Sequence, residues 1–179
     1  MNLTFTPMGR LEIDDARIIF RNFQGREGEY NKNGERNFSV SIGGGTLDDG
    51  HSIKDATAEE MADALMKDVN RFGVSWNVKI KAPTEEGDYP RIHLPVKVNF
   101  NEMGPRIYLI SGHNRVDLTE ETVGMLDQIE IARVDLDIAP SDKVVNGKPY
   151  RTAYLRSMCV VQEVDRFAAR FAEEEFPEE

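Results

Sequence analysis

The sequence contains little of what a disulfide, a metal centre or a membrane span requires. It has one cysteine, Cys159, which cannot form an intramolecular disulfide or a thiolate zinc site. Its three histidines, His51, His93 and His113, lack the spacing of a metal site. No apolar run reaches the roughly 18 residues of a transmembrane helix, and the first residues do not resemble a signal peptide. These absences favour a cytosolic protein, and we expect no cofactor, no metal and no membrane partner.

Positive charge is also scarce. The chain carries 22 Lys and Arg against 32 Asp and Glu, which gives a net charge of −10 at pH 7. Nucleic-acid binding depends mainly on cations that contact phosphates, so this balance counts against that function. The acidic residues are unevenly placed, however. Residues 171–179 contain five glutamates and no basic residue, which leaves 22 basic and 27 acidic residues in the rest of the chain.

What is present is a strong pattern of β-strands. The 179 residues are 40% hydrophobic, enough for one substantial domain with a buried core. Alternating apolar and polar residues predict strands over 11–23, 36–42, 74–81, 91–100, 106–111, 129–138 and 150–164. Thr57 and Glu60 form a capping box that starts a helix over 57–72. A shorter helix is predicted over 117–126, begun by Asp117, and Asn146-Gly147 is a strong hairpin signal.

This order of elements predicts a mainly β fold with α+β elaborations, namely a five-stranded OB-fold Greek-key barrel with an inserted helix and extra strands. Such barrels bind nucleic acid with their second and third strands and two loops, here 24–35 and 139–149. We assign this OB-fold domain to residues 1–165. A short helix and a disordered acidic tail follow over 166–179. A generic α+β domain is the alternative.

Basic and aromatic side chains gather around these two loops and the strands between them. Cations contact the phosphates of single-stranded DNA and aromatic rings stack on its bases, and neither contact reads sequence. Phe20, Phe38, Trp76 and Phe100 fall on apolar faces, so we assign them to the core. The candidate DNA-binding residues are Arg17, Arg21, Phe23, Arg26, Tyr30, Lys32, Arg36, Lys79, Lys81, Tyr89, Arg91, Lys97, Lys143, Lys148, Tyr150, Arg151, Tyr154 and Arg156.

The acidic tail is the second candidate functional feature. A run of like charge usually only solvates a chain end. A tethered anion can also occupy a cationic groove and compete with DNA. The apolar pair Phe176-Pro177 offers a contact for a partner protein, such as one acting in replication or recombination. The tail residues assigned to these roles are Glu173, Glu174, Glu175, Phe176, Glu178 and Glu179.

Several blocks of this sequence resemble a family of small proteins from tailed phages. The most specific are Ala-Arg-Ile-Ile-Phe-Arg-Asn-Phe-Gln-Gly-Arg at 16–26 and Thr-Val-Gly-Met-Leu-Asp at 122–127. Shorter matches bring the resemblance to residues 10–172. Members of this family are single-stranded DNA-binding proteins with an OB-fold. The resemblance implies a role in phage DNA replication and recombination, without catalysis, in the cytoplasm of the infected bacterial host. The ending Glu178-Glu179 differs from related acidic tails that finish in an aromatic residue.

Two functions of other classes stay open. The acidic balance favours a phage protein-interaction module that does not bind DNA. Carboxylate groupings could instead hold the divalent metal of a nuclease, although each also reads as turn chemistry or an exposed strand face. These groupings are Asp14-Asp15, Asp48-Asp49 with His51, and Asp135 with Asp137. Duplex binding has less support, because no predicted helix carries a basic face for the major groove.

Overall fold

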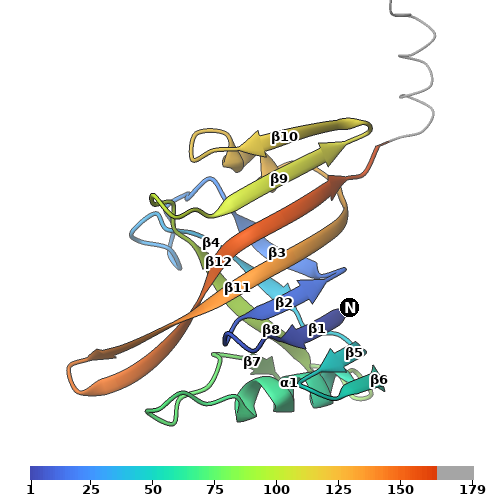
Figure 1. Cartoon of the computed structure of the whole chain (residues 1–179), viewed down its shortest axis with the longest axis vertical. Coiled ribbons are helices and arrows are strands. Elements are labelled where there is room, and N and C mark those ends of the chain that lie inside the picture. Colours follow the sequence, from blue (N-terminus) through green and yellow to red (C-terminus); the bar gives the residue numbers. More distant parts are fainter. Residues whose placement is uncertain (165–179) are drawn as a thin grey trace, which may run out of the picture.

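The structure is a computed structural model that describes residues 1–164 (Figure 1). Those residues form twelve strands, one α-helix, α1 (Ala58–Lys67), and one 3₁₀ helix, η1 (Val123–Asp127). A mainly β domain with one α-helix is confirmed. The strands are β1 (Asn2–Phe5), β2 (Leu11–Asp14), β3 (Arg17–Asn22), β4 (Arg36–Ser41), β5 (Gly45–Asp48), β6 (Ser52–Ala56), β7 (Lys79–Lys81), β8 (Arg91–Val98), β9 (Arg106–Ser111), β10 (Asn114–Leu118), β11 (Ile131–Val145) and β12 (Lys148–Gln162).

The strands form one mixed sheet. Its main path runs β3-β4-β8-β12-β11-β2-β1-β5-β6, with β7 paired to β8, and β9 placed between β12 and β10. The two strands β2 and β3 are predicted as one strand over 11–23. They are separated only by Asp15, which has a φ of 53°, and Ala16. The chain therefore changes direction at Asp15. As a result β2 and β3, which follow each other in the sequence, lie far apart along the sheet path.

One face of this sheet packs into the core. Alternate residues of β8, namely Ile92, Leu94, Val96 and Val98, are all buried, as the period of two in that segment predicts. Trp76 and Phe38 are among the largest fully buried side chains, which confirms their assignment to the core. Burial of a large apolar side chain contributes about 1.5–3 kcal/mol to folding.

The helix α1 begins as predicted and ends early. The Thr57 hydroxyl accepts from the Glu60 N–H, and the Glu60 carboxylate accepts from the Thr57 N–H. The helix ends at Lys67 rather than at residue 72. The Asn70 side chain accepts hydrogen bonds from the N–H groups of Phe72 and Val74, and this local turn replaces the last helical turn.

A long β-hairpin replaces the predicted loop over 139–149. Strands β11 and β12 are each 15 residues long, and their pairing continues to Val145 opposite Lys148. The predicted turn at Asn146-Gly147 is confirmed, with φ values of 52° and 78°. We call residues 139–154 the arm. It projects away from the rest of the sheet in Figure 1.

The predicted helix over 117–126 is also corrected. Asp117 lies on β10 opposite Tyr108, so it does not begin a helix, and only η1 follows. Val123 and Leu126 of η1 are buried, as predicted. The short helix and tail predicted for 166–179 lie outside the described residues. Within residues 1–164, no helix is long and apolar enough to cross a membrane.

Candidate nucleic-acid interface

Strand pairing gathers basic residues from distant parts of the chain on one side of the sheet. Arg17 of β3 lies opposite Ser41 of β4, and Ser41 lies opposite His93 of β8. His93 in turn lies opposite Lys79 of β7. Residues paired in this way point to the same side of a sheet. One row of side chains therefore crosses four strands, with a cation at each end.

Further rows follow the same rule along β8. Arg91 lies opposite Lys81, while Lys97 lies opposite Asn37 on one side and Tyr154 on the other. We call this side of β3, β4, β7 and β8 the outer face. It is the side opposite the buried residues of β8. Its cations are Arg17, Lys79, Lys81, Arg91 and Lys97.

The outer face differs in charge from the rest of the molecule. The sequences of β3, β4, β7 and β8 contain no Asp or Glu. The whole chain has a net charge of −10, so this absence of acidic residues is local. A polyanion that approaches the outer face meets cations without facing carboxylates on the same strands. The net charge of −10 therefore counts less against nucleic-acid binding than the composition alone suggests.

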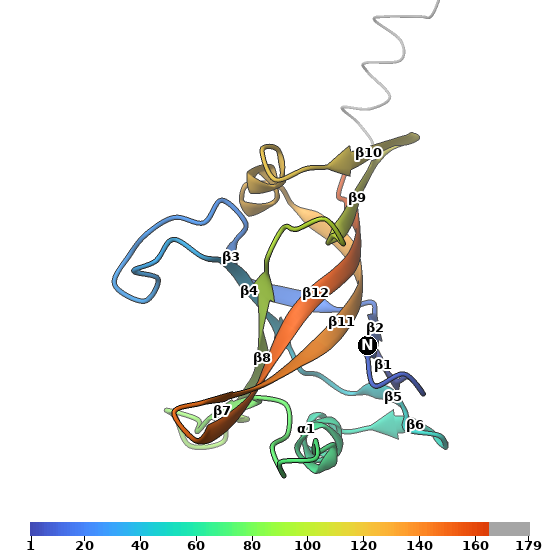
Figure 2. The same cartoon turned by 60° about the vertical axis from the view of Figure 1, so that its left-hand side comes forward.

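Two elements project on the same side of the molecule and flank these strands. In Figure 2 the loop 24–35 and the arm both extend to the left, with β4 and β8 between them. Arg36, Lys97 and Tyr154 line a recess of about 260 Å³ beside this loop. Lys97 contacts Glu35 at 3.3 Å, and Arg36 contacts Glu120 at 3.3 Å. Exposed ion pairs of this kind contribute about 0–1 kcal/mol, so phosphates can replace them.

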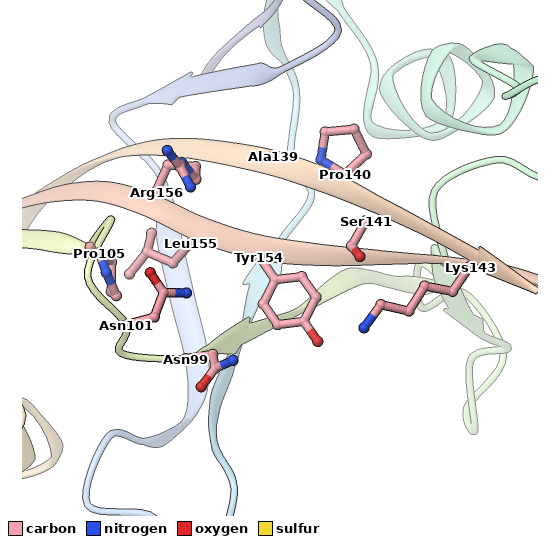
Figure 3. A pocket seen from close by; sticks show the side chains of 11 residues that line it. Asn99, Asn101, Pro105, Ala139, Pro140, Ser141, Lys143, Tyr154, Leu155 and Arg156 are labelled. Carbon is pink, nitrogen blue, oxygen red and sulfur yellow. The ribbon is translucent and has the colours of Figure 1, made fainter.

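A second recess continues from Tyr154 toward the arm. It has a volume of about 280 Å³, and its lining includes Asn99, Lys143, Tyr154 and Arg156 (Figure 3). The ring of Tyr154 lies between the side chains of Asn99 and Lys143 in this view. Asn99 and Tyr154 line both recesses, so the two recesses lie next to each other. The second recess thus brings two cations, Lys143 and Arg156, close to the aromatic ring of Tyr154.

A third recess lies at the other end of β8. Lys81, Tyr89 and Arg91 contribute to its lining, and its volume is about 480 Å³. Tyr89 is mostly exposed, on the segment that joins β7 to β8. Lys81, Tyr89 and Arg91, which the sequence predicts to contact DNA, thus meet at this end of the outer face.

The loop 24–35 is held at its base by hydrogen bonds. The Asp127 carboxylate accepts from the N–H groups of Phe23 at 2.7 Å and Gln24 at 3.0 Å. The Asn31 amide donates to the carbonyls of Arg26 and Glu35. This arrangement leaves Arg26, Tyr30 and Lys32 exposed, with 98% of Tyr30 accessible. The Thr-Val-Gly-Met-Leu-Asp block therefore contains the carboxylate that anchors this loop.

Comparison with known proteins identifies the family. The sequence profile of a phage ssDNA-binding domain matches residues 2–179, which is nearly the whole chain. The chain belongs to the phage ssDNA-binding domain family. The family resemblance inferred from the sequence blocks is confirmed. A search of the curated proteins finds no match.

Solved structures resemble this phage ssDNA-binding domain in fold. One is the single-stranded DNA-binding protein from bacteriophage Enc34, with a TM-score of 0.52, 12% identity, and coverage of 93% of this chain and 88% of that chain. Another is the same phage protein in complex with ssDNA, with a TM-score of 0.52, 13% identity and coverage of 93% of both chains. At this low identity, the comparison shows a shared fold.

Three of the predicted DNA contacts of this domain are engaged within the fold. Phe23 is completely buried and stacks on Phe38 at 5.2 Å, so its ring cannot stack on a base. Arg21 donates to the carbonyl of Leu126 at 2.7 Å and to that of Ile129. The hydrogen bonds of Arg21 join β3 to η1 and to the residues that follow it. The prediction that Phe23 and Arg21 contact DNA is therefore corrected.

Arg151 is the third. Only 7% of its side chain is exposed, and its guanidinium lies 2.9 Å from an Asp142 oxygen and 3.7 Å from Asp68. Burial of Asp142 raises the pKa of its carboxyl, but hydrogen bonds from Arg151 and Asn70 outweigh this and hold the pKa below its usual value. Arg151 therefore ties the arm to the end of α1. Lys148 and Tyr150 remain exposed near the tip of the arm.

Phe20 is a candidate that sequence reasoning placed wrongly. Its alternation with neighbours predicts a core residue, yet 67% of it is exposed. Its ring lies 5.5 Å from that of His93 on the outer face, at an interplanar angle of 76°. Burial and the charge of Lys79 hold the pKa of His93 below its usual value, which favours the neutral ring. Phe100, also assigned to the core, is only partly buried.

The carboxylate groupings considered for a metal have structural partners. Asp135 accepts from the Asp15 N–H at 2.9 Å and contacts Arg133, while Asp137 contacts Arg10. Asp48 and Asp49 accept from backbone N–H groups in the turn after β5. Across residues 1–164, no three His, Cys, Asp or Glu side chains are grouped as metal ligands.

Proposed function

We propose that this phage ssDNA-binding domain holds single-stranded DNA along the outer face, between the loop 24–35 and the arm. Membership of the family indicates that the ligand is single-stranded DNA. The observation that carries the location is the row of cations on β3, β7 and β8, on strands without a single Asp or Glu. The Enc34 protein, which shares the fold, has been solved in complex with ssDNA, and this supports the proposal.

The proposed contacts divide into cations for phosphates and rings for bases. Neither kind of contact distinguishes the four bases, so we propose largely sequence-independent binding without chemical turnover. Peripheral contacts come from Arg26, Tyr30 and Lys32 on the loop and from Lys148 and Tyr150 on the arm. The central contacts come from the outer face and its recesses, at Arg17, Arg36, Lys79, Lys81, Tyr89, Arg91, Lys97, Lys143, Tyr154 and Arg156.

We further propose that the strands around this face form an OB-type barrel. The main sheet path has β3 at one end and reaches β2 after four intervening strands, and the chain links β2 to β3 through Asp15 and Ala16. The Ala16 N–H donates to the Val134 carbonyl of β11 at 2.8 Å, which supports closure at this point. Such barrels bind oligonucleotides on the face assigned here.

Titration of poly-dT tests the function directly. We expect the chain to retard labelled poly-dT in a gel and to bind duplex of the same length more weakly. If the five outer-face cations each neutralise one phosphate, log affinity should fall against log salt with a slope of about −3.5. Binding that does not change with salt, or no retardation at low salt, would contradict the proposal.

We propose that binding protects single-stranded DNA during phage DNA replication and recombination, in the cytoplasm of the infected host. The acidic residues Glu173, Glu174, Glu175, Glu178 and Glu179 are proposed to compete with DNA for the outer face, and Phe176 to recruit partner proteins. A tethered anion acts at a high effective concentration near a cationic surface.

Deletion of residues 171–179 should tighten poly-dT binding. We expect a gain of roughly 3- to 10-fold at low salt, because the tethered competitor is removed. The gain should shrink as salt screens the tail from the face. Fluorescence anisotropy of a labelled oligonucleotide measures both effects. A variant with the five glutamates changed to glutamine is the control of equal length, and it should behave as the deletion does.

A further inference from the structure

Phe20 combines two features that are unfavourable for an aromatic residue. Its φ is 53°, in the left-handed region that residues with a Cβ rarely adopt. Most of its ring is exposed to solvent, so hydrophobic burial does not compensate for this conformation. Such backbone outliers concentrate at binding and catalytic sites, where they place a side chain for function.

A bulge in β3 turns Phe20 to the outer face. Ile19 lies opposite Ser39, and the next paired residue, Asn22, lies opposite Asn37. Phe20 and Arg21 therefore oppose the single residue Phe38, and β3 contains one extra residue at this point. Arg21 points inward to the carbonyls of Leu126 and Ile129. These two hydrogen bonds hold the bulge in place and leave Phe20 on the opposite side.

The surroundings of Phe20 suit a nucleobase. Its ring meets His93 nearly at right angles, and His93 belongs to the row that ends in the cations Arg17 and Lys79. No carboxylate lies on these strands. A base on the Phe20 ring would therefore have cations on both sides for its flanking phosphates.

We propose that Phe20 is a base-stacking residue of the DNA site, presented by the β3 bulge and supported from the side by His93. The proposal rests on the proposed function of the outer face and adds the residue on which a base is held. It also explains why an aromatic side chain occupies a position with positive φ. Loss of one stacked base weakens binding by about 5- to 150-fold.

The test compares Phe20→Leu with Phe20→Tyr. Leucine keeps an apolar side chain without a ring face, so we expect F20L to bind poly-dT about 5- to 150-fold more weakly. F20Y keeps the ring and should bind within about 3-fold of the wild type. Phe72→Leu, at another exposed phenylalanine, is the matched control and should not change binding.

An oligonucleotide with abasic sites separates stacking from packing. Its phosphates are unchanged, so the wild type should bind it more weakly than poly-dT, and F20L should show a smaller difference. Wild-type affinity in F20L, or an equal loss on both oligonucleotides, would overturn the proposal. If F20L binds normally while neutralisation of Lys79, Arg91 and Lys97 weakens binding, the stacking role alone fails. If neither change matters, the outer face itself is the wrong site.

Discussion

Replacement of Lys79, Arg91 and Lys97 together by glutamine should weaken poly-dT binding by roughly 100-fold at low salt. These three cations lie along β7 and β8 on the outer face, where the pairing of strands brings them into line. Loss of three phosphate contacts should also make the salt slope shallower by about 2. Anisotropy titrations at four salt concentrations would measure both quantities.

The matched control removes the same amount of charge elsewhere. Lys54, Lys67 and Arg115 are exposed residues of β6, α1 and β10, outside the outer face. Changing all three to glutamine alters the net charge equally, so general electrostatic attraction falls by the same amount. We expect a loss of less than about 5-fold and little change in the salt slope. Equal losses in the two variants would mean that the outer face is not the DNA site.

Phe23→Ala should destabilise the fold by about 3–5 kcal/mol, because a fully buried aromatic side chain is removed from the core. Its stacked partner Phe38 would face the resulting cavity. For a chain of this size, such a loss lowers the melting temperature by roughly 10 °C. Circular dichroism melting measures it. DNA binding by the folded fraction should change little, since the ring is not available to a base.

Tyr30→Ala provides the opposite case. Tyr30 is almost fully exposed on the loop 24–35, so its removal should alter stability by less than about 0.5 kcal/mol. Any effect of Tyr30→Ala should therefore appear in the affinity for DNA.

For Phe23→Ala, a protein that stays stable but binds DNA more weakly would contradict the assignment of the Phe23 ring to the core.

Much of the local structure follows from short patterns in the sequence. The alternation of β8 predicts its buried and exposed sides, because successive strand residues point in opposite directions. The capping box at Thr57 and Glu60 and the turn at Asn146-Gly147 depend only on nearby atoms. Local interactions of this kind are readable without knowledge of distant contacts.

The bulge in β3 shows why alternation failed for Phe20 and Phe23. Alternation along an unbroken strand predicts Phe20 in the core, whereas Phe23, at the strand end, is predicted as a candidate DNA contact. The one extra residue of the bulge shifts the alternation, so each following residue faces the other side of the sheet. The bulge depends on Arg21 reaching carbonyls more than 100 residues away in the sequence, at Leu126 and Ile129. No local pattern records that contact.

The sequence by itself determined a mainly β domain, its helix start, its hairpin turn and its family, because these depend on neighbouring residues or on whole motifs. Only the tertiary structure decided which basic and aromatic residues share a surface. Strand pairing brings Arg17, Lys79 and Lys97 to one side, although the sequence separates them widely. The same pairing turns Phe23 and Arg151 inward and Phe20 outward. Long-range register and the bulge set these orientations, and composition does not encode them.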